Sequence, residues 1–143
     1  MSYPVLALIR SSYALLRSGQ TVILQRHLHH LTGTLFLSLR ELYSSSPSAQ
    51  CFLKIPSACP ESPIFAIQAQ QPRDLAMVLQ SQGMMVRAVV PPTVPLGTER
   101  VRICLHAGNT EVEVQKLVRM IKQWCEDRLN TAVENVTNIT AKL

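Results

Sequence analysis

The chain has 143 residues, a length that suits one domain with a core of its own. Hydrophobic residues make up 47% and charged residues only 16%, which indicates a globular protein with some apolar surface for a partner. The net charge is +5, but the basic residues are scattered along the chain and aromatic residues make up only 5%. This composition does not indicate a nucleic-acid-binding surface. No apolar run approaches the roughly 18 residues of a membrane-spanning helix. We therefore expect neither a nucleic-acid nor a membrane partner.

The cysteines and histidines do not have the spacing of metal ligands. The four cysteines form no Cys-x-x-Cys pair, and no histidine spacing completes a zinc set. His27 and His30 share one face of a predicted helix but have no acidic third ligand nearby. We expect buried or incidental thiols, solvated or capping histidines, and no metal site.

Two helices are predicted at the N-terminus. Residues 4–17 roughly follow a helical period up to Gly19, with Pro4 in an early helical position. Thr21–Tyr43 is predicted as a longer helix, because leucines recur three or four positions apart on one stripe. That stripe is interpreted as core and consists of Leu24, Leu28, Leu31, Leu35, Leu39 and Leu42. Residues 1–43 are thus expected to be linking helices that lead into a small domain.

The middle of the chain is predicted to contain loops, strands and one helix. Residues 44–48 are serine-rich and predict a loop, followed by a short strand at Cys51–Ile55. A buried strand is predicted at Pro63–Gln68. Pro72 starts a helix that Gly83 ends in the left-handed cap position. Its expected core residues are Leu75, Val78 and Leu79.

Two strand-like runs flank a proline-rich turn. Val86–Val90 is a β-branched apolar run that Pro91 and Pro92 must end, because proline gives a sheet no N–H. Beyond the turn, Arg100–His106 alternates between apolar and polar residues. Val101, Ile103 and Leu105 lie on one predicted face, and Arg100, Arg102, Cys104 and His106 lie on the other. Both guanidinium groups are therefore expected to point the same way.

The last predicted helix begins near Thr110, with Glu113 in capping-box register and Asn109 as an equally good N-cap. Its expected buried face is Val114, Leu117, Val118, Ile121 and Cys125, with Trp124 over an edge of the core. The order of elements predicts an α+β fold, a small, mostly antiparallel sheet with helices packed on one face. We expect residues 44–127 to form this domain and residues 128–143 to form a polar, unpatterned tail.

The chain contains no motif that builds a catalytic centre by itself. It lacks a Gly-x-Ser-x-Gly elbow, a phosphate-binding glycine loop and an obvious acid–base pair among its nine acidic residues. Its lysines lie in predicted loop, helix or tail segments and are interpreted as surface residues. They are Lys54, Lys116, Lys122 and Lys142. An arginine beside a stiff loop is suited to bind a carboxylate through two parallel N–H bonds. On spacing alone, the favoured interpretation is that Arg100 and Arg102 line an exposed face and pair with acids such as Glu99.

A family resemblance changes this balance. Pro91-Pro92-Thr93-Val94-Pro95-x-Gly97-Thr98-x-Arg100-Val101-Arg102-Ile103 resembles the C-terminal signature of the α-oxoamine synthases. These are pyridoxal-phosphate enzymes of fold type I. The similarity is greatest to the biotin-pathway branch, which condenses L-alanine with pimeloyl thioester and releases the carboxyl group. It extends weakly over residues 7–125.

The resemblance implies roles for particular residues. Arg102 would hold the amino-acid carboxylate, Arg100 would be a possible secondary contact, and Thr93 would approach substrate and cofactor from the loop. The family's cofactor-binding groups and its aldimine lysine precede this region, and the chain has no counterpart of them. The resemblance therefore implies a C-terminal small domain that lacks catalytic residues and is inactive alone. The cofactor would be bound mainly by a large domain, and the complete enzyme would be a homodimer.

Two departures from the family pattern leave alternatives open. Val90 stands where the bacterial form often has arginine, and Asn109 stands where that form has histidine. These two differences leave the identity of the acyl substrate undecided. One alternative is a non-catalytic remnant or interaction module that pairs with a full-length synthase. Another is a member of the branch that makes 5-aminolevulinate, which Pro91-Pro92 disfavours because that branch more often has an aromatic residue there.

The C-terminus resembles an organelle address. Ala141-Lys142-Leu143 is a conservative variant of the Ser-Lys-Leu peroxisomal signal, which a receptor reads at a free C-terminus. Fungal enzymes of the biotin branch resemble peroxisomal proteins in having such termini. We expect import into the peroxisomal matrix, with a cytoplasmic location as the alternative.

Overall fold

A computed structural model describes residues 3–140, with side chains described as far as residue 134. The fold is α+β, as predicted. In chain order the elements are α1 (Tyr3–Arg17), α2 (Val22–Ser45), α3 (Pro47–Phe52), β1 (Leu53–Lys54), β2 (Ile64–Ala69), α4 (Pro72–Ser81), β3 (Val86–Val89), β4 (Arg100–Cys104) and α5 (Glu111–Thr140). None of these helices is long and apolar enough to cross a membrane, within the residues that the structure describes.

The four strands form one antiparallel sheet in the order β1-β2-β4-β3. Because side chains alternate across a strand, each strand gives one set of residues to each face of the sheet. One face is buried and is formed by Leu53, Phe65, Ile67, Ala69, Val86, Val101 and Ile103. The predicted apolar face of the last strand, which includes Leu105, is therefore confirmed.

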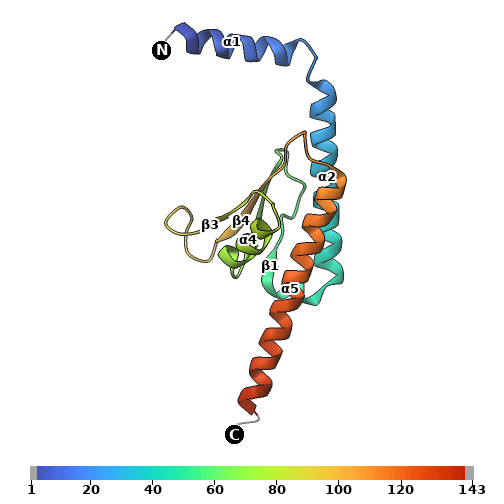
Figure 1. Ribbon diagram of the computed structural model, residues 1–143, viewed down its shortest axis with the longest axis vertical. Helices are drawn as coiled ribbons and strands as arrows, with labels where there is room; N and C mark the ends of the chain where they lie inside the picture. The colour runs from blue at the N-terminus through green and yellow to red at the C-terminus, as the bar shows by residue number, and fades with distance from the viewer. Residues whose placement is uncertain (1–2, 141–143) are drawn as a thin grey trace.

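The helices cover the buried face of the sheet in a second layer. Helix α4 contacts β2, β3 and β4, and α5 contacts α2, α3 and α4 (Figure 1). The buried face of α5 includes Val114, Leu117, Ile121 and Cys125, as the helical spacing predicts, whereas Val118 is only partly buried. This arrangement confirms the prediction of helices packed on one face of a small sheet.

The N-terminal helices are less buried than the leucine stripe predicts. The stripe enters the core only from Leu31 onward, and Leu24 is 53% exposed, so its assignment to the core is wrong. Helix α1 contributes no buried residue. Figure 1 shows the reason, since α1 and the start of α2 lie beyond the end of the sheet. An apolar period predicts a helix but does not specify whether another element covers its face.

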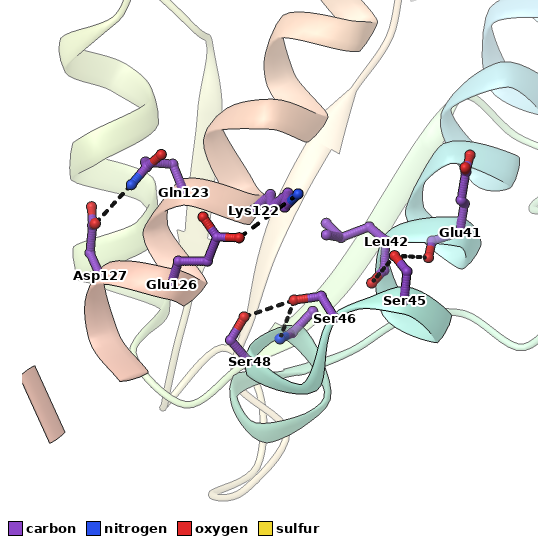
Figure 2. A network of polar contacts seen from close by, with 10 residues as sticks. Glu41, Leu42, Ser45, Ser46, Ser48, Lys122, Gln123, Glu126 and Asp127 are labelled. Carbon is purple, nitrogen blue, oxygen red and sulfur yellow. Dashed lines mark hydrogen bonds and ion pairs between the residues drawn. The ribbon is translucent and has the colours of Figure 1, made fainter. Parts of the chain in front are cut away.

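The predicted loop at residues 44–48 is wrong. Helix α2 continues to Ser45, and α3 begins at Pro47, so Ser46 alone joins the two helices. The Ser46 hydroxyl accepts a hydrogen bond from the Ala49 N–H and contacts the Ser48 hydroxyl at 2.8 Å (Figure 2). A serine run has the composition of a loop, but one serine followed by proline also makes a good helix start.

The boundaries of β1 and α4 differ from the prediction in detail. The predicted strand Cys51–Ile55 is reduced to Leu53–Lys54. Helix α4 begins at Pro72, and Gly83 adopts a left-handed φ of +84°, as expected for the end of a helix. Leu75 and Leu79 are buried, but Val78 is exposed, so its assignment to the core is wrong. Ala76 takes the core position instead.

Helix α4 is joined to α5 by one acidic side chain. The indole N–H of Trp124 and the guanidinium of Arg128 each donate to Asp74 Oδ2 at 2.6 Å. Trp124 is 3% exposed and belongs to the core, with its polar atom satisfied. The contact fixes the middle of α5 against the helix that covers the sheet.

The start of α5 is a capping box centred on Thr110. The Thr110 hydroxyl accepts from the Glu113 N–H at 3.3 Å, and the Glu113 carboxylate accepts from the Thr110 N–H at 2.8 Å. The Asn109 carboxamide oxygen instead accepts from the His106 N–H, so Thr110 is the cap. At its other end α5 continues to Thr140, where an unpatterned polar tail was expected after Arg128. A helix can extend past its packed region because its backbone hydrogen bonds are internal.

The capping box predicts how stability changes with pH. The hydrogen bond from the Thr110 N–H has the largest effect on the pKa of Glu113, and the hydrogen bond from the Asn109 side chain has the next largest. Both lower that pKa below its usual 4.5. The stabilisation from ionised Glu113 is therefore complete above pH 4.5 and is lost as the pH falls through the lower folded value. Thermal melting between pH 7 and pH 3 should show a smaller acid-induced loss of stability for Glu113→Gln than for the wild type. Glu134→Gln is the control, and an equal loss in all three proteins would contradict the prediction.

Candidate functional site

The face of the sheet opposite the helices is open to solvent. Alternation along β4 places Arg100, Arg102 and Cys104 on this face, as the sequence pattern predicts. In the strand register, Arg102 lies between Ala66 of β2 and Arg87 of β3. The two predicted arginines thus share one face, and a third arginine lies beside them.

The strand residues of the open face carry positive charge without compensating acids. Its cationic residues are Lys54, Arg87, Arg100 and Arg102, and none of the strand residues of the sheet is acidic. Arg87 and Arg102 are directly opposite each other, which is an unfavourable arrangement for two like charges. The face therefore has the electrostatic character of an anion-binding surface.

Arg100 and Arg102 differ in how their side chains are engaged. The Arg100 Nε–H donates to the Thr98 carbonyl at 3.0 Å, and this residue is partly buried. Arg102 is exposed and has no hydrogen-bond or ion-pair partner among the side chains and backbone that the structure describes, up to residue 134. The pairing with Glu99 that the spacing suggested is not formed in this part of the chain. Of these two arginines, Arg102 has an unengaged guanidinium, whereas Arg100 is bonded to the loop through its Nε–H.

Thr93 lies in the loop that joins β3 to β4. Its backbone N–H donates to the Val90 carbonyl at 3.0 Å, and its side chain is exposed. The loop contains a cis peptide bond between Pro91 and Pro92 and is closed by a Thr98 Oγ1 bond to the Pro95 carbonyl at 2.8 Å. Among the described residues, no hydrogen bond links Thr93 to Arg102. The structure therefore places both residues on one hairpin without joining them.

The open face has no enclosing wall in this part of the chain. A groove of about 360 Å³ lies between the β3–β4 edge and α5, and its polar lining includes His106, Glu113 and Lys116. Two further grooves of about 300 and 480 Å³ border β1 and the α4–α5 contact. Thr93, Arg100 and Arg102 line none of the three. The arginine face can supply at most one side of an enclosed site.

The described residues do not fit pyridoxal phosphate. Lys54, Lys116 and Lys122 are all exposed, whereas an aldimine lysine needs a desolvated amine. Lys116 lines the groove beside α5, but its ammonium group donates to the Gln82 carbonyl at 3.3 Å. The acidic residue in that groove, Glu113, is held by the capping box. No step of a cofactor reaction can be assigned to these residues.

The two positions that depart from the family pattern have local structural contacts. The Asn109 side chain bonds to the His106 N–H and to Glu113, and its carbonyl is 2.9 Å from His27 Nε2. Val90 is partly buried and accepts the Thr93 N–H bond. His30 pairs with Glu111 at 2.6 Å. These histidines connect α2 to the start of α5, and the described residues contain no cluster of three or more potential metal ligands.

Sequence reasoning missed Arg87. It lies inside Val86–Val90, which the pattern describes only as an apolar, strand-like run. Strand alternation alone places Arg87 on the polar face, but its pairing with Arg102 depends on the register across the β3–β4 hairpin. The long proline-rich loop does not specify that register in the way that a two-residue turn would.

Comparisons with known proteins confirm the family resemblance. The chain is 44% identical over 131 residues to the 8-amino-7-oxononanoate synthase of Emericella nidulans, covering 88% of this chain and 30% of the relative. It is 32% identical over 110 residues to the enzyme of the same name from Leptothrix cholodnii, covering 77% of this chain and 27% of the relative. The chain thus spans less than a third of the length of these relatives. No family model matches it.

A comparison of structures finds a partial overlap with a solved enzyme. Serine palmitoyltransferase from Sphingomonas wittichii overlaps 64% of this chain and 23% of its own chain, with a TM-score of 0.46 and 22% sequence identity.

Proposed function

We propose that this chain supplies the amino-acid-binding part of a larger enzyme. The premise is its similarity to the pyridoxal-phosphate-dependent α-oxoamine synthases. The reaction proposed for the complete enzyme is that of 8-amino-7-oxononanoate synthase. It condenses L-alanine with a pimeloyl thioester in biotin biosynthesis and releases the alanine carboxyl group. The complete enzyme is proposed to be a homodimer in which another part of the protein binds pyridoxal phosphate and carries the aldimine lysine.

The observation that carries this proposal is the unengaged guanidinium of Arg102 on the open face of the sheet. A planar guanidinium binds a carboxylate through two parallel N–H bonds, and β4 fixes the start of the side chain on a rigid strand. Holding the carboxylate there orients the substrate relative to the reacting groups. Thr93, on the adjoining loop, is proposed to contact the substrate from one side.

Arg100 has a supporting role in this proposal. Its bond to the Thr98 carbonyl ties the end of β4 to the loop that carries Thr93. The acyl chain is proposed to be pimeloyl because relatives named 8-amino-7-oxononanoate synthase match most of this chain. Val90, which replaces an arginine of the bacterial pattern, is the position most relevant to that choice.

A second candidate function is favoured by the N-terminal helices. Helix α1 buries none of its residues, and its exposed apolar side chains include Tyr3, Leu6, Leu8, Tyr13 and Leu16. Such a surface suits an interaction module that docks on a full-length synthase without taking part in catalysis. A stable complex between this chain and the full-length Emericella nidulans enzyme, together with an inactive chimera of the two, would favour this function.

The proposed function is tested in a chimera. The matching part of the Emericella nidulans relative is replaced by this chain, and product formation from L-alanine and pimeloyl-CoA is measured. The chimera should be active, whereas this chain alone with pyridoxal phosphate should give no product. Arg102→Gln in the chimera should raise the KM for alanine by about 30- to 1,000-fold, which corresponds to roughly 2–4 kcal/mol for an anion that loses its paired charge.

Arg119→Gln is the matched control, because Arg119 is an exposed arginine on α5, away from the open face of the sheet. An unchanged KM for alanine in the Arg102→Gln chimera would contradict the proposed clamp. Preference for glycine over alanine would favour the branch that makes 5-aminolevulinate instead.

The location of the protein is proposed to be the peroxisomal matrix, with the cytoplasm as the alternative. Ala141, Lys142 and Leu143, which resemble the import signal, lie outside the described residues. A fluorescent protein fused to residues 128–143 should accumulate in peroxisomes, and deletion of Leu143 should return it to the cytosol. A cytosolic distribution of both fusions would contradict the proposal.

A further inference from the structure

Arg87 is a second guanidinium on the open face that the proposed function does not use. It is exposed, and it has no hydrogen-bond or ion-pair partner in the described part of the chain. Its cross-strand partner is Arg102, which is free in the same way. The two side chains start from directly opposite positions on neighbouring strands.

This arrangement is unfavourable without an anion. Directly opposite residues of an antiparallel pair have Cβ atoms about 5 Å apart, and like charges at that spacing repel. An oxyanion held between the two guanidinium groups converts the repulsion into two charge-assisted interactions. Each group has a planar set of N–H donors, so two of them can bind different oxygens of one carboxylate or phosphate.

The surroundings leave access to this pair. Ala66 flanks Arg102 on the β2 side, and its methyl group is too short to cover the guanidinium. Arg87 lies on β3, an edge strand in the order β1-β2-β4-β3. Arg100 lies two residues from Arg102 along β4, on the same face of the sheet, but its Nε–H donates to the Thr98 carbonyl. The free cationic pair is therefore Arg87 and Arg102.

We propose that Arg87 and Arg102 form a paired-guanidinium site that binds one oxyanion, with Arg87 as a further substrate-binding residue beside Arg102 and Thr93. The inference deepens the proposed function, because it assigns a partner to the Arg102 clamp. The same pair binds a divalent phosphate more tightly than a monovalent carboxylate, because both cations then face a larger negative charge.

The test uses the full 143-residue chain and inorganic phosphate as the probe. Arginine Nε–H signals are followed by NMR during titration at pH 8 and low ionic strength, where screening is weak. Saturable shifts of the Arg87 and Arg102 signals are expected, with weaker binding of acetate. Arg87→Gln and Arg102→Gln should each weaken phosphate binding at least fivefold, and the double variant should add little because both residues serve one site.

Arg119→Gln removes the same charge from a different surface and should change the phosphate affinity by less than twofold. If Arg102→Gln weakens binding but Arg87→Gln behaves like Arg119→Gln, the pairing is overturned while the proposed clamp stands. If both sheet variants behave like the control, or the wild type shows no saturable shift, the paired site is overturned. The chimera measures alanine use separately, so its failure alone would contradict the proposed function without affecting the phosphate result.

Discussion

The position of β4 between β2 and β3 determines which of its residues enter the core and which face solvent. Its alternate residues belong to two different environments, with Val101 and Ile103 in the core and Arg102 on the open face. A shift of the register by one residue would bury the guanidinium and expose the core residues, so packing of the buried face fixes the polar face as well. The hydrophobic core thus determines where the arginines lie.

The sequence predicts the parts of this architecture that follow from local patterns. Strand alternation predicts the face of Arg102, and the Thr110–Glu113 spacing predicts the capping box, because both depend on residues close in the chain. Features that depend on contacts between residues far apart in the chain are not predicted from the sequence. Leu24 has the spacing of a core residue but no element covers it, and Arg87 becomes relevant only through its pairing with Arg102. The serine-rich joint at Ser46 shows that composition alone does not separate a loop from a helix cap.

The open face and α1 are two surfaces that the described residues leave uncovered, and they differ in chemistry. The sheet face is cationic and has unengaged guanidinium groups, which suits a small anionic ligand. Helix α1 exposes apolar side chains, which suits a protein surface. Because the chain spans 30% of the Emericella nidulans relative, we propose that the remainder of a synthase covers both. The arginine hairpin would then form one wall of an active site whose other wall carries the cofactor.

The accessibility of Cys104 reports whether another part of the protein covers the open face of the sheet. Cys104 is exposed on the open face, next but one to Arg102 along β4, whereas Cys51 lies on α3 and is also exposed. Labelling by a thiol reagent, followed by mass spectrometry, compares the isolated chain with the Emericella nidulans chimera. If the rest of a synthase covers the arginine face, Cys104 reacts at least tenfold more slowly in the chimera, while the labelling of Cys51 changes little. Equal labelling of Cys104 in both proteins would contradict the claim that the arginine face is one wall of a shared site.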